Sequence, residues 1–187
     1  TSSGAYNEDG SLIANANVVY VTDATKDTVS LYVEGATTNP CVGLQNILLG
    51  YKKKAETKPL NVRIIGNITD FAVMDKGDLL LDGNGAGITI EGVGKDAVAN
   101  GWGLRIKGVS NVEIRNLAFM NCDSSEGDNV SLQQDNDHVW VHHCDLFYGG
   151  PGGDSDQAKG DGALDIKKSD YATFSYNHFW DSGKSSL

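Results

Sequence analysis

The sequence has little proline and little cysteine, and each shortage narrows what the chain can be. Only 3 of its 187 residues are proline, against 23 glycines, and this balance favours many tight turns between short strands over disordered low complexity. Its three cysteines, Cys41, Cys122 and Cys144, are too few and too scattered for a disulfide framework or a zinc ribbon. We expect buried free thiols, with a Cys122–Cys144 bridge as the open alternative.

The chain also lacks positive charge and long apolar runs. A formal net charge of −10 argues against a nucleic-acid partner, because phosphate binding needs a basic face. An acidic protein can still bind a polyanion if a metal ion bridges the two. No apolar run approaches the length of a membrane span, so no membrane partner is expected. With 40% hydrophobic and 21% charged residues, the composition predicts one globular domain.

The first 60 residues contain the one convincing helix pattern of the chain. Alternating segments at Val18–Thr22 and Val29–Val33 predict two early strands. A helix is predicted over Pro40–Ala55, with Asn39 as its cap and apolar residues at helical spacing. Lys52–Lys54 then fall in its last turns, where cations favourably meet the negative end of the helix dipole. A substrate-binding patch is the less favoured interpretation of these lysines.

From about Val62 a repeated pattern of short strand, polar turn and second strand predicts the fold. Equivalent positions recur from 88 to 112, from 112 to 139 and from 139 to 172, which are steps of 24, 27 and 33 residues. Such a period indicates a solenoid, and the repeats contain no helical segment. The expected class is all-β, a right-handed single-stranded parallel β-helix with an N-terminal capping α-helix. The aligned strand triplets are Leu104-Arg105-Ile106, Val130-Ser131-Leu132 and Leu164-Asp165-Ile166, followed by Ile88-Thr89-Ile90, Val112-Glu113-Ile114, Val139-Trp140-Val141 and Ala172-Thr173-Phe174.

The domain organisation follows from these repeats. We expect a single β-helix domain over 1–187, with a cap region at 1–60 and coils at 61–187. Asn116, His143 and Tyr176 occupy equivalent positions and should form an interior or turn ladder. The growing period predicts longer loops at 122–127 and 148–160, where a binding cleft would lie. Since residues 179–187 stop inside a repeat, the domain is expected to be a truncated piece or to be continued by a second chain.

Acidic residues gather beside two of the predicted strands. Asp161 and Asp165 are four apart and project to the same face of one strand, because strand side chains alternate with period two. Glu126 and Asp128 lie at the mouth of another. If the two strands are neighbours, as many as four carboxylates could converge, and like charges at close range require a cation. Oxygen ligands in such numbers suit a hard cation such as Ca2+.

These segments carry a resemblance to a known family. The chain resembles the pectate lyases of polysaccharide lyase family 1, and the resemblance covers about residues 60–187. It implies a secreted, extracellular enzyme (EC 4.2.2.2 type) that cleaves polygalacturonate by β-elimination, with Ca2+ between enzyme carboxylates and the substrate carboxylate. The motifs that carry it are Gly101-Trp102-Gly103-Leu104-Arg105-Ile106, Asn111-Val112-Glu113-Ile114-Arg115-Asn116-Leu117, Asp128-Asn129-Val130-Ser131-Leu132, Val139-Trp140-Val141-His142-His143, and Asp161-Gly162-Ala163-Leu164-Asp165-Ile166-Lys167 with Ser175-Tyr176-Asn177.

The resemblance also implies roles for individual residues. Asp128, Asp161 and Asp165 match the acids that hold calcium in the family, and Glu126 matches an acid that binds additional calcium. Lys184 matches the lysine that contacts the substrate carboxylate. The catalytic arginine of the family belongs to an Arg-x-Pro-x-x-Arg segment beyond the last residue of this sequence.

Two alternatives therefore stay open beside the lyase. One is an inactive β-helix fragment that binds calcium and pectate and needs a complementary C-terminal chain. The other is a pectin lyase, against which the retained acids argue. The four histidines suggest a transition-metal site, but His142 and His143 are adjacent and should point to opposite faces of a strand. Structural roles are therefore expected for them.

Overall fold

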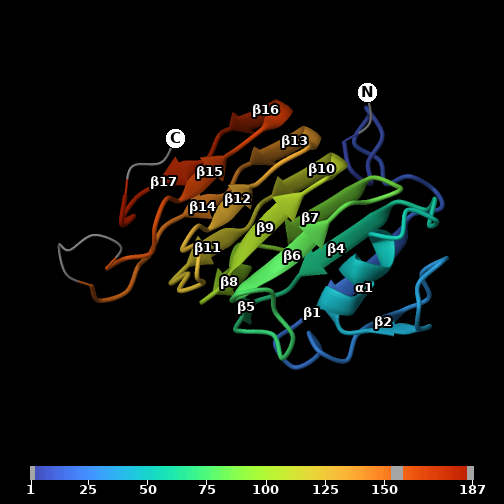
Figure 1. Ribbon diagram of the computed structural model, residues 1–187, viewed down its shortest axis with the longest axis horizontal. Helices are drawn as coiled ribbons and strands as arrows, with labels where there is room; N and C mark the ends of the chain where they lie inside the picture. Colours follow the sequence, from blue (N-terminus) through green and yellow to red (C-terminus); the bar gives the residue numbers. More distant parts are fainter. Residues whose placement is uncertain (1–2, 153–157, 185–187) are drawn as a thin grey trace.

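The repeated apolar triplets stack on one another as parallel strands. In the computed structural model, which describes residues 3–152 and 158–184, three parallel sheets run along the described part of the molecule (Figure 1). Each full coil adds one strand to each sheet. The predicted parallel β-helix is confirmed.

The strands are grouped by sheet. The largest sheet has the order β1 (Asn17–Val21), β4 (Leu60–Ile64), β7 (Ile88–Gly92), β10 (Ser110–Arg115), β13 (Asn136–His142), β16 (Ser169–Ser175). The second has the order β17 (His178–Phe179), β14 (Asp145–Leu146), β11 (Ala118–Met120), β8 (Val98–Asn100), β5 (Asn67–Ile68). The third, which we call the site sheet, has the order β15 (Leu164–Ile166), β12 (Val130–Leu132), β9 (Gly103–Lys107), β6 (Asp78–Asp82). A small antiparallel pair joins β2 (Ser30–Leu31) to β3 (Cys41–Val42).

The register of the coils agrees with the alignment of the sequence repeats. Val130 of β12 pairs with Leu104 on one side and with Leu164 on the other. In the largest sheet, Val112 pairs with Ile88 and Val139. The apolar repeat therefore specifies which residues face each other in neighbouring coils.

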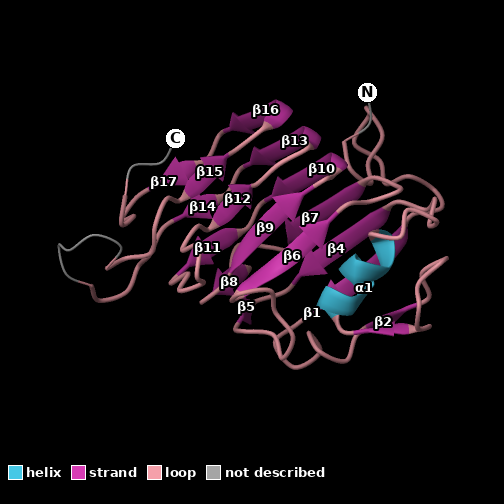
Figure 2. Cartoon of the chain, in the orientation of Figure 1, coloured by secondary structure: helices cyan, strands magenta, loops and turns pink. Residues whose placement is uncertain are grey.

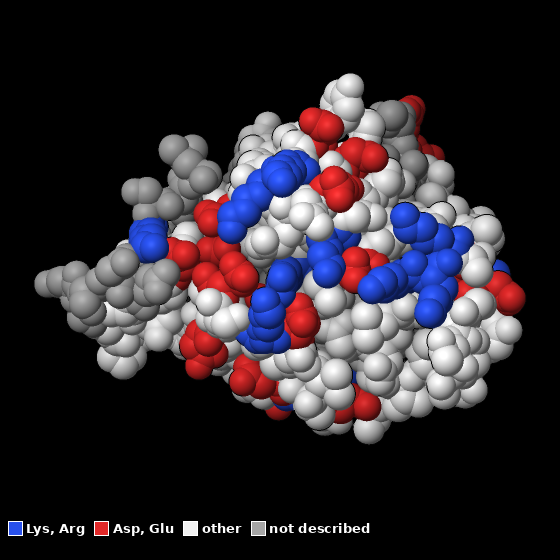
Figure 3. Space-filling view, in the orientation of Figure 1, with Lys and Arg blue, Asp and Glu red and all other residues white. Residues whose placement is uncertain are grey.

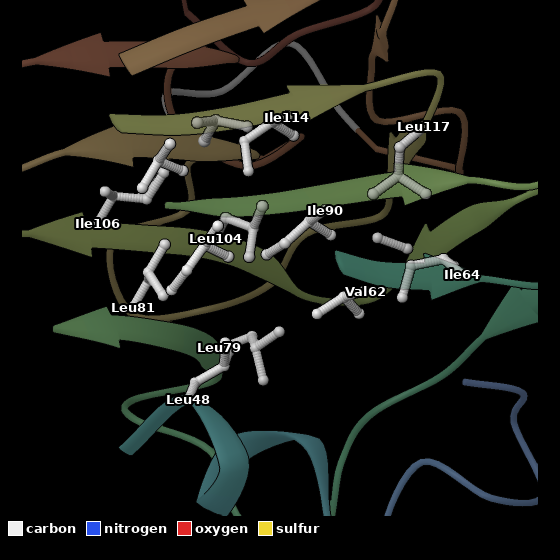
Figure 4. Close-up of a cluster of buried hydrophobic side chains, with 14 of the residues drawn as sticks. Leu48, Val62, Ile64, Leu79, Leu81, Ile90, Leu104, Ile106, Ile114 and Leu117 are labelled. Carbon is white, nitrogen blue, oxygen red and sulfur yellow. The ribbon is translucent and has the colours of Figure 1, made fainter. Parts of the chain in front are cut away.

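Stacked aliphatic side chains fill the interior between the sheets (Figure 4). Leu79, Leu104 and Val130 belong to one column of the site sheet, and each has at most 1% of its surface exposed. Val62, Ile90 and Ile114 form a similar column in the largest sheet. Burying one such side chain stabilises the fold by about 1.5–3 kcal/mol. Because the inward side chains stabilise the fold, the outward positions of the site sheet can carry polar side chains.

The turn ladder is confirmed at Asn116, His143 and Tyr176. Their φ angles are 50°, 51° and 55°, so all three turn the chain in the left-handed region, which favours asparagine among non-glycine residues. The rings of His143 and Tyr176 stack with centroids 5.0 Å apart. The Asn116 side chain instead binds the main chain, because its Nδ2 donates to the carbonyl oxygen of Gly92 at 2.8 Å.

The helix of the cap region is shorter than predicted. α1 (Leu44–Tyr51) is the only helix in the described residues (Figure 2), whereas the sequence pattern predicted Pro40–Ala55. Asn39 does not cap it. Its amide instead bonds Val33, with Oδ1 accepting from the main-chain N–H at 3.0 Å and Nδ2 donating to the carbonyl at 2.8 Å. Lys52–Lys54 therefore lie beyond the end of the helix, which corrects their predicted placement in its last turns.

The predicted capping role of α1 is confirmed by its contacts with β6. Gln45 Oε1 accepts from the Leu80 N–H at 2.8 Å, and Gln45 Nε2 donates to the Leu80 carbonyl at 2.9 Å. Leu44, Ile47 and Leu48 are fully buried. The helix thus covers the edge of the site sheet, where unpaired backbone groups would otherwise be exposed.

Other early predictions have mixed outcomes. The strand predicted at Val18–Thr22 is β1, displaced by one residue, and it pairs with β4. The strand predicted at Val29–Val33 is reduced to β2. All three cysteines lie in the described part and are free and buried, as expected. The described residues contain no helix long and apolar enough to cross a membrane.

Candidate functional site

The predicted acids lie where the chain enters two neighbouring strands of the site sheet. Asp128 precedes β12 by two residues and Asp161 precedes β15 by three. Asp165 is on β15 itself, beside Ser131 of β12. The two entering loops are tied together, because the Asp161 N–H donates to the Gly127 carbonyl at 2.9 Å. Pairing of the two strands therefore brings acids of neighbouring coils to one place, as the sequence predicted.

Asp128 and Asp165 meet over Gly162. A Cβ atom on Gly162 would lie 2.6 Å from Asp165 Oδ1 and 3.4 Å from Asp128 Oδ1. Both carboxylate oxygens thus approach the same point, and a side chain at Gly162 would occupy the space between them.

Asp128 is electrostatically the most perturbed acid of the site. Its exposed fraction is 3%, and its Oδ1 is buried without a hydrogen-bond partner. The pKa of Asp128 is raised to about 7, first by burial and then by the charges of Asp165 and Asp161, while Lys167 and the Gly162 N–H act to lower it. An acid with an unpartnered buried oxygen next to two other acids is suited to bind a cation.

Lys184, the lysine predicted to contact the substrate, lies beside Asp161. Lys184 Nζ lies 3.0 Å from Asp161 Oδ1, and the Lys184 N–H donates to the Asp161 carbonyl at 3.2 Å. The lysine side chain is 41% exposed, so its ammonium can also reach a ligand in solvent.

Glu126 occupies a different part of the site. It lines a cavity of about 210 Å³ together with Asp161, Tyr148 and Gly160. The wall of this cavity comes from both of the longer loops predicted at 122–127 and 148–160, although residues 153–157 lie outside the described residues. The two loops do meet next to the acids, and Glu126 faces the cavity that they enclose.

One buried acid beside this site escaped the sequence analysis. Asp78, at the start of β6, is 1% exposed and its Oδ1 has no hydrogen-bond partner. The pKa of Asp78 is raised to about 6, mainly by burial and to a lesser degree by the charge of Glu126, while Ser124, the Gly103 N–H and Arg105 act to lower it. Asp78 pairs in register with Gly103. In the sequence, Asp78 could have been recognised by its position directly before the apolar run at residues 79–81.

The donor set fits a hard cation such as calcium. Within residues 3–152 and 158–184, no three His, Cys, Asp or Glu side chains form a ready-made metal group. Calcium takes six to eight oxygens, however, and water or ligand oxygens commonly complete its shell. The unpartnered Asp128 Oδ1, with Asp165 Oδ1 beside it, is the observation that supports the fit.

The histidines are closer together than the sequence predicted. His142 Nδ1 and His143 Nδ1 are 2.8 Å apart, because His143 lies in the left-handed turn and the alternation of the strand ends there. His142 Nε2 also lies 2.9 Å from Glu113 Oε1, which links β13 to β10. The expectation that these side chains point to opposite faces is therefore wrong, while a structural role for His142 agrees with its contacts.

Comparison with curated proteins identifies lyases that act on pectate as relatives of this chain. The family pattern described as pectate lyase matches residues 61–187. The chain is 38% identical over 104 residues to pectate lyase A of Emericella nidulans, covering 55% of this chain and 31% of that protein. It is 27% identical over 159 residues to a pectate trisaccharide-lyase of Bacillus licheniformis, covering 82% of this chain and 44% of that protein. The chain thus spans less than half the length of these relatives.

Solved structures agree in fold. A pectate lyase from Bacillus sp. N165 in complex with trigalacturonate superposes with a TM-score of 0.69 at 22% identity, over 100% of this chain and 52% of that one. Pectate lyase C of Erwinia chrysanthemi, at pH 9.5 with 30 mM Ca2+, gives 0.59 at 21% identity, over 89% and 49%. Since the family pattern covers well over half of the sequence, the chain belongs to the pectate lyase family.

Proposed function

We propose that this chain provides the calcium-binding and uronate-binding part of a lyase that cleaves polygalacturonate by β-elimination to unsaturated oligogalacturonates. The observation that carries the proposal is Asp128, a buried acid with an unpartnered oxygen and with Asp161 and Asp165 as its charged neighbours. Asp128, Asp161 and Asp165 would hold Ca2+, and Glu126 would hold additional calcium at the neighbouring cavity. Calcium, when bound, offsets negative charge on the uronate carboxylate and so makes the adjacent C5 proton more acidic.

Two residues of the chain, Lys184 and Asp161, bind and position the substrate. The Lys184 ammonium binds and orients the substrate carboxylate, because it is half-exposed and lies 3.0 Å from Asp161 Oδ1. Asp161 positions this ammonium in turn. A charge fixed before the reaction stabilises developing negative charge more effectively than mobile water does.

Removal of the C5 proton needs a group outside this set. The family resemblance assigns that step to an arginine of an Arg-x-Pro-x-x-Arg segment, which residues 1–187 do not contain. A guanidinium has a pKa above about 12, so activity should rise with pH. If no such group is supplied, the chain is a calcium-dependent pectate-binding fragment that does not cleave. A pectin lyase is disfavoured, since it would not need the acids.

A cleavage assay separates these functions. Polygalacturonate is incubated with the chain in calcium and in excess chelator, and the ultraviolet absorbance of the unsaturated product is followed. We expect calcium-dependent product from the chain extended at its C-terminus, and loss of product in Asp165→Asn. Binding without product, even in the extended chain, would support the non-cleaving alternative. Product in chelator would contradict the calcium proposal.

An extracellular location belongs to the same proposal, because polymeric polygalacturonate cannot enter a cell. Immunoblots of culture medium and cell lysate test it. Protein retained wholly in the lysate would argue against secretion.

A further inference from the structure

We propose that Lys52, Lys54 and Lys107, which we call the cap-side lysines, form a second uronate-binding subsite on the site sheet. This inference rests on the proposed function. It extends the binding surface away from the acids and toward the cap helix α1. A long polygalacturonate chain would then contact both ends of the sheet, whereas a short oligomer would contact the acids alone.

The outward rows of the site sheet connect the two ends. Leu80, Arg105, Ser131 and Asp165 pair in register across β6, β9, β12 and β15, and this row ends in the acid site. Two positions further along β6 and β9, Asp82 pairs with Lys107. Because neighbouring strands are about 4.8 Å apart, β9 lies about 10 Å from β15. A linear ligand that crosses the strands from Asp165 would therefore reach Lys107 within a few monomers.

Two of the cap-side lysines share one carboxylate, and the third lies beside the next residue. Lys52 Nζ lies 2.6 Å and Lys107 Nζ 3.7 Å from Asp82 Oδ2. The Lys54 side chain packs over the next residue, since a Cβ on Gly83 would lie 3.4 Å from Lys54 Cε. Two ammonium groups on one aspartate, with the Lys54 side chain beside the next residue, leave a local surplus of positive charge in a chain whose net charge is −10.

These charges are available to a ligand. The side chains of Lys52 and Lys107 are 52% and 34% exposed, and an ammonium has three donors, of which Asp82 uses at most one in each lysine. On the face seen in Figure 3, one group of lysine and arginine side chains lies toward the α1 side, and others lie beside the acidic side chains of the C-terminal coils. Arg105 lies between them, but its Nη1 is paired with Asp75 at 2.8 Å and its side chain is only 14% exposed.

The helix end does not account for this arrangement. α1 stops at Tyr51, and the Lys52 ammonium reaches across to β6 instead of staying over the last helical carbonyls. An ion pair that merely fastens the helix to the sheet would need only Lys52 and Asp82. Lys107 adds a second cation from the neighbouring strand, and Lys54 adds a third beside Gly83. A polymer with a carboxylate on every sugar gives all three lysines a common partner.

Binding measurements with ligands of two lengths test the inference. Lys54→Gln/Lys107→Gln removes two charges and keeps the Lys52–Asp82 pair. The control Lys95→Glu makes the same change in net charge at an exposed residue of the turn between β7 and β8. Affinities for polygalacturonate and for trigalacturonate are measured in calcium at low and at moderate salt, after thermal unfolding has shown that both variants are folded.

The double variant should bind polygalacturonate about five-fold more weakly at low salt, with a smaller difference at moderate salt, because exposed charge pairs contribute modestly and are screened. Its affinity for trigalacturonate should equal that of the wild type, and Lys95→Glu should change neither. An equal loss for both ligands, or equal behaviour of the two variants, would overturn the subsite and leave the proposed function intact. If the wild type bound neither ligand in calcium, the proposed function itself would fail.

Discussion

The side chain of Gln45 bonds the main chain of Leu80 as a neighbouring β-strand would. One amide accepts from the Leu80 N–H at 2.8 Å and donates to the Leu80 carbonyl at 2.9 Å. The helix thereby pairs the main chain of Leu80 at the first edge of the site sheet. The cap and the acid site are thus two ends of one continuous sheet.

Replacing this amide should destabilise the cap. Gln45→Leu keeps the volume and leaves the Leu80 N–H and carbonyl unpaired, so we expect a loss of about 1–3 kcal/mol in the free energy of unfolding, measured by urea titration. Asn46→Leu is the control, because Asn46 donates to Val42 at an exposed position. Equal small losses in the two variants would show that the Gln45 bonds do not stabilise the cap.

The raised pKa of Asp128 predicts a pH-dependent stability in calcium-free protein. Its ordinary pKa is 3.8 and its folded pKa about 7, so between these values the native state holds a proton that the unfolded state has lost. Asp128 should therefore make stability fall as pH rises from about 4 to about 7, by on the order of 4 kcal/mol. Asp128→Asn should remove this contribution and leave the smaller one of Asp78, whose pKa is raised to about 6.

Chemical unfolding across that pH range, with chelator present, measures the effect. Asp96→Asn, in an exposed turn, should keep the pH dependence of the wild type. The same pH dependence in wild type and in Asp128→Asn would mean that Asp128 is ionised at little cost, and it would contradict the prediction. Added calcium should offset the fall, since it binds the ionised form.

Gly162 keeps open the space between two acids. In Gly162→Ala the new methyl group would lie 2.6 Å from Asp165 Oδ1, so the carboxylate must move and calcium affinity should fall about ten-fold or more. The loss should be much smaller when the change is made in Asp165→Asn, because residues in contact are not additive. Calorimetric titration of the four proteins tests this, and additive losses would show that the glycine acts by another route.

Lys184 should separate substrate binding from calcium binding. Lys184→Gln removes the ammonium beside Asp161, so trigalacturonate should bind about ten-fold more weakly in calcium. Calcium affinity should stay the same or rise, because Asp161 loses a cationic partner. Lys159→Gln breaks a similar pair, with Asp181 at 2.6 Å, and serves as the control. Equal effects of the two variants on trigalacturonate would remove the assigned role.

Much of the fold could be predicted from the apolar repeat. Leu104, Val130 and Leu164 are each followed by a polar residue and then by an apolar one, and this alternation predicted both the strand and its register. The helix limits could not be predicted, because Asn39 and Pro40 have the residue types of a helix start but Asn39 is used to bind Val33. At this point the side chain of Asn39 binds the main chain six residues earlier, so residue preference alone gave the wrong helix start.

The candidate site was predicted in part for a similar reason. Asp128, Asp161 and Asp165 stand next to recognisable strands, so their convergence followed from strand pairing. Asp78 was missed because three successive leucines follow it and conceal the alternation of β6. The proximity of His142 and His143 was missed because a left-handed turn at His143 cannot be recognised from strand periodicity alone.

Calcium titration by calorimetry tests the central claim most directly. Wild-type protein, Asp128→Asn/Asp165→Asn and the control Asp96→Asn are titrated at a pH above 7, with trigalacturonate and without it. We predict calcium binding by the wild type and the control, strengthened by trigalacturonate, and none by the double variant. Equal calcium binding by all three proteins, or no binding by the wild type with trigalacturonate present, would contradict the account.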